Sequence, residues 1–115
     1  MDVTLFASAN EYTAPKHHGC SCFRLQGLDA SNTDDFWVGM SHFLPGGGAE
    51  TDSSPFEKVY VVTAGEITVE AQGEKKTLKV NDSCYIPAHE VRTVVNQSKL
   101  PASMLVIITK HAKAL

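Results

Sequence analysis

Residues 45–66, PGGGAETDSSPFEKVYVVTAGE, carry the strongest fold signal in the chain. The stretch opens with a Pro-Gly-Gly-Gly turn signal, continues into a β-rich run over Lys58–Thr63, and ends at an Ala-Gly turn signal. Within the run, Lys58, Tyr60 and Val62 alternate with valines, which is the period of a strand with two different faces. The stretch therefore predicts a loop, a strand and a tight turn.

Similar short runs lie on both sides of this stretch, and no window has the apolar spacing of an amphipathic helix. Short strands separated by turns favour an antiparallel barrel or sandwich over a sheet with crossover helices. We expect strands at Ser21–Gln26, Phe36–Phe43, Lys58–Thr63, Glu66–Ala71, Lys75–Val80, Ser83–Ile86, Val91–Asn96 and Ser103–Thr109.

Composition and charge narrow the class of protein. The chain has 115 residues, and 43% of them are hydrophobic, which fits one globular domain. Ten Lys and Arg against thirteen Asp and Glu give a net charge of −3, which argues against a nucleic-acid partner. No apolar run approaches the ~20 residues of a membrane span, so we expect no membrane partner.

The beginning of the chain and the cysteine count indicate a compartment and a domain division. Residues 1–13 lack the positive and apolar regions of a secretory signal, and three cysteines are too few for a disulfide scaffold. We therefore expect a cytoplasmic protein. Residues 1–19 have no clear period and are predicted to form an N-terminal arm or edge strand, and residues 20–115 form the single domain.

Two stretches resemble the signature motifs of the cupin superfamily. From Gly46 to Gly65 the chain keeps the family spacing: Gly, five residues, His-x-His, three residues, Glu, six residues, Gly. From Asn81 onward the second motif places Pro87 and Asn96 where the family has the same residue types. The resemblance implies an all-β fold, a cupin-type antiparallel jelly-roll β-barrel, and a homodimer.

The chain departs from this family at the positions of the metal ligands. Where the motifs have His, His, Glu and His, this sequence has Asp52, Ser54, Lys58 and Arg92. Divalent metals bind carboxylate, imidazole or thiolate donors, and protonated Lys and Arg offer no lone pair. Side-chain charge thus takes the place of metal charge, and we expect no metal and no other cofactor.

The resemblance implies that the Lys58 and Arg92 faces of their strands point into the barrel. We expect Arg92 to anchor a carboxylate, because its planar fork of donors matches that group. Tyr60, Asn96 and His42 are predicted as further substrate-binding residues. Tyr60 shares the expected interior face with Lys58, and Asn96 shares it with Arg92. His42 ends an apolar strand.

Three residues are predicted to take part in chemistry. A buried Lys58 would stabilise negative charge that develops on the substrate, and Asp52 or His89 would move a proton. These roles suit a metal-independent lyase, isomerase or decarboxylase acting on a small anionic, carboxylate-bearing metabolite. A non-catalytic ligand-binding cupin is the second hypothesis, and a metal-dependent cupin with displaced ligands is the third.

The sequence also allows other arrangements of these charged residues besides an anion site. Lys58 and Arg92 could pair with Asp52 and Glu57 in a salt-bridge network that fills a disused metal site. A strand slip of one residue would exchange Lys58 for Glu57 inside the barrel. Two sets could in principle form a metal site, namely Glu50, Asp52, Glu57, His89 and His42, or the HHxCxC cluster His17, His18, Cys20 and Cys22.

Overall fold

Short runs rich in β-branched residues form strands throughout the chain, as their alternation predicts. The computed structural model describes residues 1–115. Its elements are η1 (Phe6–Ser8), β1 (Asn10–Tyr12), β2 (His17–Gln26), β3 (Phe36–Asp52), β4 (Lys58–Ala64), β5 (Ile67–Ala71), β6 (Glu74–Leu78), β7 (Ser83–Ile86), β8 (Arg92–Val95) and β9 (Ala102–Thr109).

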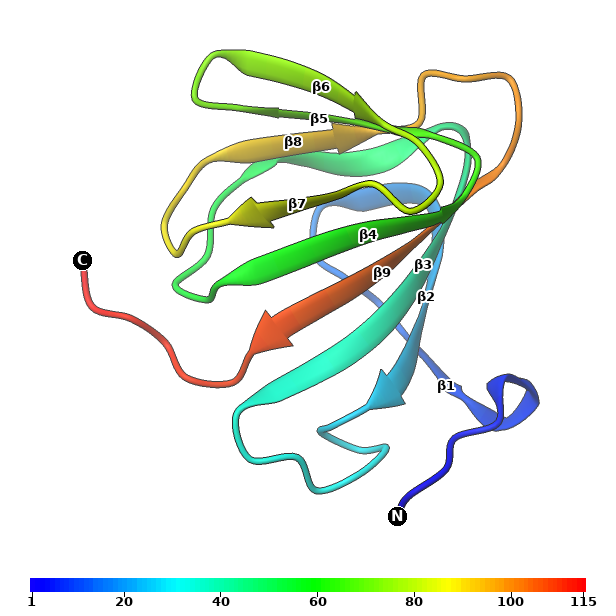
Figure 1. The fold of residues 1–115 in the computed structure, drawn as a ribbon, viewed down its shortest axis with the longest axis vertical. Coiled ribbons are helices and arrows are strands. Elements are labelled where there is room, and N and C mark those ends of the chain that lie inside the picture. The colour runs from blue at the N-terminus through cyan, green and yellow to red at the C-terminus, as the bar shows by residue number, and fades with distance from the viewer.

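The strands form a nearly closed antiparallel barrel (Figure 1). The hydrogen-bonded order is β6-β5-β8-β3-β9-β4-β7, and β1 and β2 extend the sheet beside β3. The first part of β3 pairs with β9 and its last part with β8, so one strand passes from one side of the barrel to the other. This architecture confirms the predicted all-β, antiparallel barrel.

The Pro-Gly-Gly-Gly segment is part of β3, so the loop predicted there was wrong. Gly48 pairs with Val95 in the register of β3 with β8. A Cβ atom at Gly48 would lie 2.1 Å from the Val94 carbonyl oxygen, and one at Gly47 would lie 2.1 Å from the Gly19 oxygen. The glycines therefore let three backbones approach closely while β3 bends, and the bend replaces a loop.

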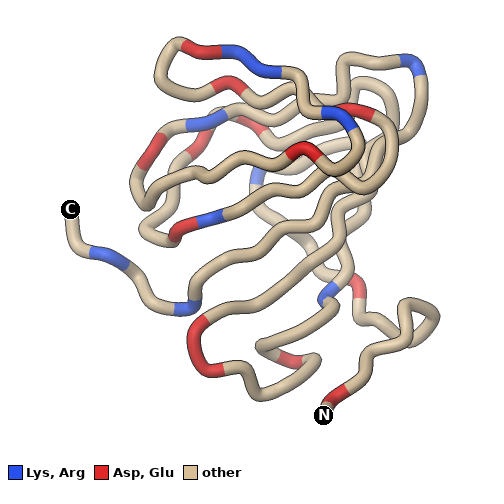
Figure 2. Tube along the Cα trace, in the orientation of Figure 1, with Lys and Arg blue, Asp and Glu red and all other residues tan.

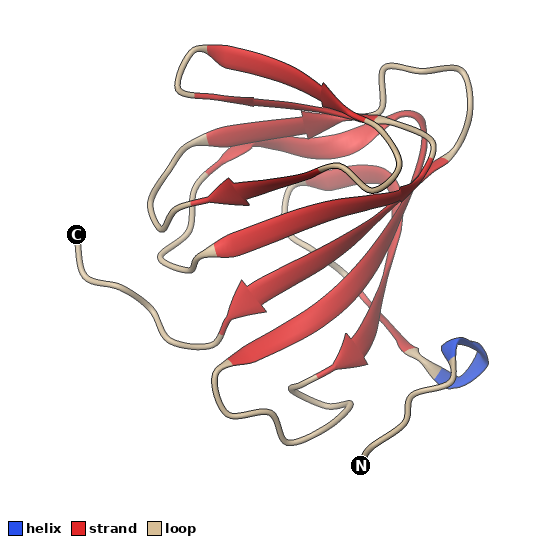
Figure 3. Cartoon of the chain, viewed as in Figure 1, coloured by secondary structure: helices blue, strands red, loops and turns tan.

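The start of the chain joins the sheet earlier than expected. β2 begins at His17 rather than at Ser21. The short β1, which lies in the segment expected to form an arm or edge strand, pairs with residues 22–24 of β2. The only helical element is the 3-10 turn η1 near the N-terminus (Figure 3). No helix has the length and apolar character needed to cross a membrane.

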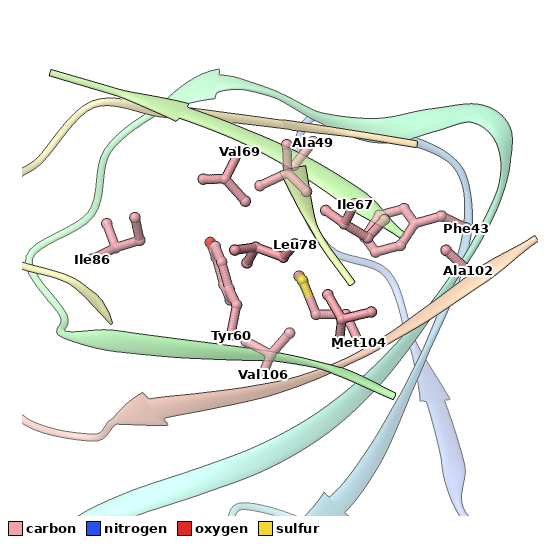
Figure 4. Packing of buried hydrophobic residues seen from close by; sticks show 12 residues of the cluster. Phe43, Ala49, Tyr60, Ile67, Val69, Leu78, Ile86, Ala102, Met104 and Val106 are labelled. Atoms are coloured by element: carbon pink, nitrogen blue, oxygen red, sulfur yellow. The ribbon is translucent and has the colours of Figure 1, made fainter. Parts of the chain in front are cut away.

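The core fills the barrel between its two sides. Twelve buried apolar residues form one cluster, and Figure 4 shows their side chains pointing inward from strands on both sides of the barrel. Phe43, Val62 and Ile67 are almost fully buried in it. Two charged side chains, Lys58 and Arg92, are buried beside this apolar cluster, each 8% exposed. Buried charged side chains are unusual in a small barrel, so the cavity that these two side chains line is the candidate functional site.

Candidate functional site

A cavity of about 430 Å³ lies in the barrel and opens to solvent. Lys58 and Arg92 lie near each other on its wall, and we call this part of the wall the cationic end. Tyr12, Arg24 and Trp37 form a second group on its wall, which we call the aromatic end. The other lining residues include apolar side chains of the core strands.

Lys58 is the first residue of β4 and lies between Ile86 of β7 and Ile108 of β9 in the sheet register. This register turns its side chain into the barrel, as the family resemblance implied. Its Nζ donates a hydrogen bond to Ser54 Oγ at 2.6 Å. The hydroxyl satisfies one donor of the ammonium group and supplies no opposite charge.

Arg92 is the first residue of β8 and is paired with Asp52 of β3 in the sheet register. Its Nε donates to the Tyr60 hydroxyl at 3.0 Å, and its Nη1 donates to the Glu50 carbonyl oxygen at 3.0 Å. Both acceptors are neutral. They hold the guanidinium in one orientation, and its other terminal nitrogen is left without an acceptor from the protein.

Neither buried cation forms an ion pair. The structure contains four ion pairs, and none of them involves Lys58 or Arg92. The salt-bridge network that the sequence left open is therefore not formed. Acidic and basic residues are otherwise interspersed along the chain trace, without a broad face of one sign (Figure 2).

Glu57 lies outside the barrel, which resolves the question of strand register. Its Oε1 accepts a hydrogen bond from the Tyr85 hydroxyl at 2.7 Å and lies 3.2 Å from Lys113 Nζ. These two contacts lower the pKa of the Glu57 carboxyl, the hydrogen bond from Tyr85 being the larger cause. Because neighbours on a strand face opposite sides, Lys58 occupies the interior.

The electrostatics of the cavity reflect this lack of carboxylate partners. Burial lowers the pKa of Lys58, the nearby Arg92 lowers it further, and Asp52 opposes the change. Burial also raises the pKa of Tyr60, so its phenol stays protonated beside Arg92. At the cationic end, desolvation thus disfavours the positive charge of Lys58, and a bound anion would stabilise that charge.

Asp52 lies at the rim of the cavity rather than deep inside it. Its side chain is 38% exposed, and its Oδ1 lies 3.5 Å from Lys16 Nζ. A backbone hydrogen bond from Ser53 is the main cause that lowers the pKa of Asp52, so its carboxylate is ionised near neutral pH. His17 also lines the cavity, and burial lowers the pKa of its imidazole.

Three of the predicted site residues lie elsewhere. His42 packs against the rings of Phe6 and Phe23, and its Nδ1 lies 2.7 Å from Ser103 Oγ. His89 lies in the loop before β8, where its Nε2 is 2.7 Å from the Lys113 carbonyl oxygen. The structure brings neither imidazole to the cavity wall.

Asn96 is fully buried but serves the loop between β8 and β9. Its Nδ2 donates to the Phe43 and Leu100 carbonyl oxygens, and its Oδ1 accepts from the backbone and the hydroxyl of Ser98. All of its polar atoms are therefore occupied by the protein. It is not part of the cavity wall.

No residue of the aromatic end was predicted from the sequence, and His17 was assigned to the HHxCxC cluster. Tyr12, Arg24 and Trp37 come from β1, β2 and β3, and they meet only because these strands are adjacent. The alternation within β2 and β3 is the one sequence signal that could have placed Arg24 and Trp37 on the inner face. It does not say which residues lie across from them.

The residues present do not fit a divalent metal ion. No three side chains among His, Cys, Asp and Glu lie together in a way that could hold one, so neither of the two sets considered from the sequence is assembled. At the positions of the family's ligands, Lys58 and Arg92 contribute cationic nitrogens, and Ser54 already accepts a hydrogen bond from Lys58. This donor set suits an anion instead.

Comparisons with known proteins agree with the fold. Residues 39–108 match the family described as Cupin domain. A curated protein of Mycobacterium tuberculosis, "Beta-D-galactosidase Rv1717", is 40% identical over 108 residues, which cover 94% of this chain and 93% of that protein.

Solved structures are similar to the chain over nearly its whole length. The polyketide cyclase RemF from Streptomyces resistomycificus has a TM-score of 0.84 at 15% identity and covers 99% of this chain and 82% of its own. A predicted oxalate decarboxylase from Thermotoga maritima has a TM-score of 0.79 at 16% identity, with 95% and 98% covered. At such identities the likeness concerns the fold alone. Together with the sequence match, it confirms the resemblance drawn from the two motifs: the chain belongs to the cupin family.

Proposed function

We propose that this cupin binds a small carboxylate-bearing metabolite at the cationic end of the cavity and acts on it without a metal. The enzyme class that best suits the site is a lyase, isomerase or decarboxylase. One observation carries the proposal: Lys58 and Arg92 are buried together, and neither has a carboxylate partner.

The physical argument concerns the cost of buried charge. A buried cation without a counter-charge is destabilising, and two like charges near each other add repulsion. A ligand carboxylate would relieve both effects, because Arg92 has a free terminal nitrogen and Lys58 has donors beyond the one that Ser54 accepts. Binding energy would thus come from charge that the fold itself leaves uncompensated.

The same groups suit chemistry next to a carboxylate. Removal of a proton or of carbon dioxide leaves negative charge on the substrate, and the ammonium of Lys58 would stabilise that charge in a desolvated site. Asp52, ionised at the rim, is the candidate that accepts or returns a proton.

Thermal unfolding with a panel of small carboxylates tests the binding claim. A carboxylate at a hundredfold excess over its Kd should stabilise the protein by about 2.7 kcal/mol, and the matching neutral amide should not. Arg92→Ala should abolish the shift, whereas Lys99→Ala, which removes an exposed cation, should preserve it. A panel in which no carboxylate raises the Tm would contradict the proposal.

Turnover of a bound carboxylate separates the enzyme from a binding module. We expect Lys58→Met to remove turnover and to leave the protein folded. Binding without turnover of any ligand in the panel would favour a non-catalytic cupin that holds a small molecule. Full turnover by the Lys58→Met protein would remove Lys58 from the mechanism.

A second candidate function is hydrolysis of a β-D-galactoside. The 40% identity with the mycobacterial protein of that name, over nearly the full length of both chains, favours it. Most glycosidases use two carboxyl groups on either side of the scissile bond, and Asp52 is the only acidic residue of this cavity. Release of nitrophenol from a nitrophenyl β-D-galactoside, lost in Asp52→Asn, would favour this candidate over the first.

We also propose that the protein is a homodimer, as the family resemblance implies, and that it is cytoplasmic, because its three free cysteines suit a reducing compartment. Exposed Val3, Leu5 and Phe6 give the N-terminal segment an apolar surface that a second copy would cover. Light scattering of the purified protein should give twice the chain mass of 12.5 kDa. A monomeric mass across micromolar concentrations would contradict the dimer.

A further inference from the structure

The cavity is larger than a small carboxylate needs. The cationic end occupies one part of its wall, and three large side chains occupy the other end. A volume of about 430 Å³ is within the range of cavities that hold ligands of drug size. A two- to four-carbon acid bound by Lys58 and Arg92 would leave the aromatic end unfilled.

The sheet register gives the distance between the two ends. Trp37 of β3 is paired with Ile108 of β9, and Ile108 is paired with Lys58 of β4. Paired residues share a face, and all three line the cavity. Two strand spacings separate Trp37 from Lys58, which is about 10 Å along the inner face.

The aromatic end is a built arrangement rather than a loose edge. The Arg24 guanidinium lies over the rings of both Tyr12 and Trp37, with its Cζ 4.1 Å and 4.4 Å from their centroids. The two rings meet edge to face at 5.6 Å. Such cation–π contacts hold flat groups in fixed orientations.

Gly39 makes this arrangement possible. It stands between Arg24 of β2 and Val106 of β9 in the register, at the centre of the inner face. A Cβ atom there would lie 2.6 Å from the Tyr12 hydroxyl and 3.1 Å from Trp37 Cζ3. The absence of a side chain therefore lets the Tyr12 ring lie over the sheet and form the wall of the cavity.

We propose that the ligand is an elongated acid whose carboxylate binds at the cationic end and whose far end is a flat ring. The inference rests on the proposed carboxylate site and specifies its substrate class. The ring packs against Trp37 and Tyr12, about 10 Å from Lys58. The connection between the two groups is apolar, because Ile108 and Val106 line the path. An aromatic ring and the apolar face of a sugar ring both satisfy this chemistry.

A series of acids measured by calorimetry tests the length and the ring. The series is acetate, butyrate and 4-phenylbutyrate, with 4-phenylbutyramide as the ring without charge and digalacturonate as the sugar-ring acid. We expect at least one ring-bearing acid to bind tenfold or more tightly than butyrate. Tighter binding of 4-phenylbutyrate would assign an aromatic ring, and tighter binding of digalacturonate would assign a sugar ring.

Variants of the aromatic end test which residues provide the tighter binding of the ring-bearing acid. Trp37→Ala should reduce binding of the ring-bearing acid to that of butyrate and leave butyrate unchanged. Phe36→Ala, which removes an exposed aromatic from the neighbouring position of the same strand, should change neither. Should Trp37→Ala not fold, Tyr12→Leu provides the same test from β1.

Failure of this inference is distinguishable from failure of the proposed function. Equal affinities for butyrate and both ring-bearing acids, with binding lost in Arg92→Ala, would overturn the elongated ligand and keep the carboxylate site. No binding of any acid would overturn both. Undiminished binding of the ring-bearing acid by both Trp37→Ala and Tyr12→Leu would place the ring elsewhere and overturn the inference.

Discussion

At the residue scale, the defining feature is a pair of cations that the protein itself does not neutralise. Arg92 is oriented by a phenol and a carbonyl, and Lys58 by a hydroxyl. Neutral acceptors fix the positions of these groups and leave their charge available. Functional sites often retain such destabilising groups, because the same charge is useful when a ligand binds.

Replacement of Lys58 by Met should therefore stabilise the free protein. Methionine is close to lysine in shape, and it removes a buried charge that is repelled by Arg92. We expect an increase of about 1 kcal/mol or more in the free energy of unfolding near neutral pH. Urea denaturation measures it, with Lys99→Met as the exposed control. A clear loss of stability would mean that the Ser54 hydrogen bond matters more than the burial of charge.

Carboxylate binding should weaken at alkaline pH. The pKa of Lys58 lies below the ordinary lysine value of about 10.4, because of burial and Arg92. A bound anion favours the charged form, so above the pKa of the free protein binding requires uptake of a proton. The affinity should then fall by up to about tenfold per pH unit as the ammonium of Lys58 loses its proton.

The same shift has the opposite sign for folding of the free protein. Between the lowered pKa and about 10.4, the unfolded chain binds the proton that the folded chain has lost, so this lysine favours folding more as the pH rises. Calorimetric titrations at several pH values measure the binding effect. In Lys58→Met both the carboxylate affinity and the free energy of unfolding should no longer depend on pH in this window. A pH dependence that persists would come from another titrating group.

At the element scale, β3 organises the site. It pairs with β9 in its first part and with β8 in its last part, so one strand carries both Trp37 and Asp52, the register partner of Arg92. The glycine-rich segment allows the bend between the two parts. The distance between the ends of the cavity is thus a property of one continuous strand and its neighbours.

Gly48→Ala should destabilise the protein strongly. The added methyl group would meet the Val94 carbonyl oxygen at 2.1 Å, and backbone on a paired strand cannot move aside cheaply. We expect a loss of at least about 2 kcal/mol in the free energy of unfolding. Gly46→Ala is the matched control, because its Cβ would meet nothing within 4 Å and only the left-handed backbone costs about 1 kcal/mol. Equal losses in both variants would contradict the close-approach explanation.

At the scale of the whole molecule, the cavity connects parts of the chain that are distant in sequence. Residues 12–15 and His17 line it together with β3, β4, β8 and β9. The β5–β6 hairpin contributes Val69 and Leu78 to the core and no residue to the cavity wall. Ligand binding should therefore affect the N-terminal segment and β8 more than this hairpin.

Amide hydrogen exchange tests that distribution. With the tightest acid of the series, we expect exchange to slow in residues 11–17 and in β8, and to stay unchanged in the exposed strand β6. The physical reason is that a bound ligand suppresses only those local unfolding motions that would release it, so only the amides exposed by these motions exchange more slowly. Uniform slowing over the whole chain would instead report global stabilisation, and it would contradict the expectation that the ligand acts mainly on the N-terminal segment and β8.

Much of the fold could be predicted from alternation and turn residues. All eight predicted strands occur, and Ser83–Ile86 occurs with the predicted bounds. The bounds of β1 were not predicted because three residues are too short to show a period. The continuation of β3 was missed because glycine and proline usually mark loops. Both misses arise where pairing with another strand, rather than local preference, holds the backbone extended.

The candidate site could be predicted only on its cationic side. Alternation indicates which residues share a strand face with Lys58, Tyr60 and Arg92, and the family resemblance implied that these faces point inward. The structure places all three side chains together. His42, His89 and Asn96 were chosen from motif spacing or strand position. Their side chains instead complete hydrogen bonds with Ser103, Lys113 and the loop after β8, which no local pattern indicates.

By itself, the sequence determined the strands and the antiparallel β class, because each depends on residues near one another in the chain, and the family resemblance implied that Lys58 and Arg92 point inward. The tertiary structure decided that those cations form no ion pair with a carboxylate. Asp52 is held at the rim near Lys16, and Glu57 is held outside by Tyr85 and Lys113. It also brought Tyr12, Arg24 and Trp37 together at the far end of the cavity. These contacts join residues far apart in sequence, so only the pairing of strands across the barrel could establish them.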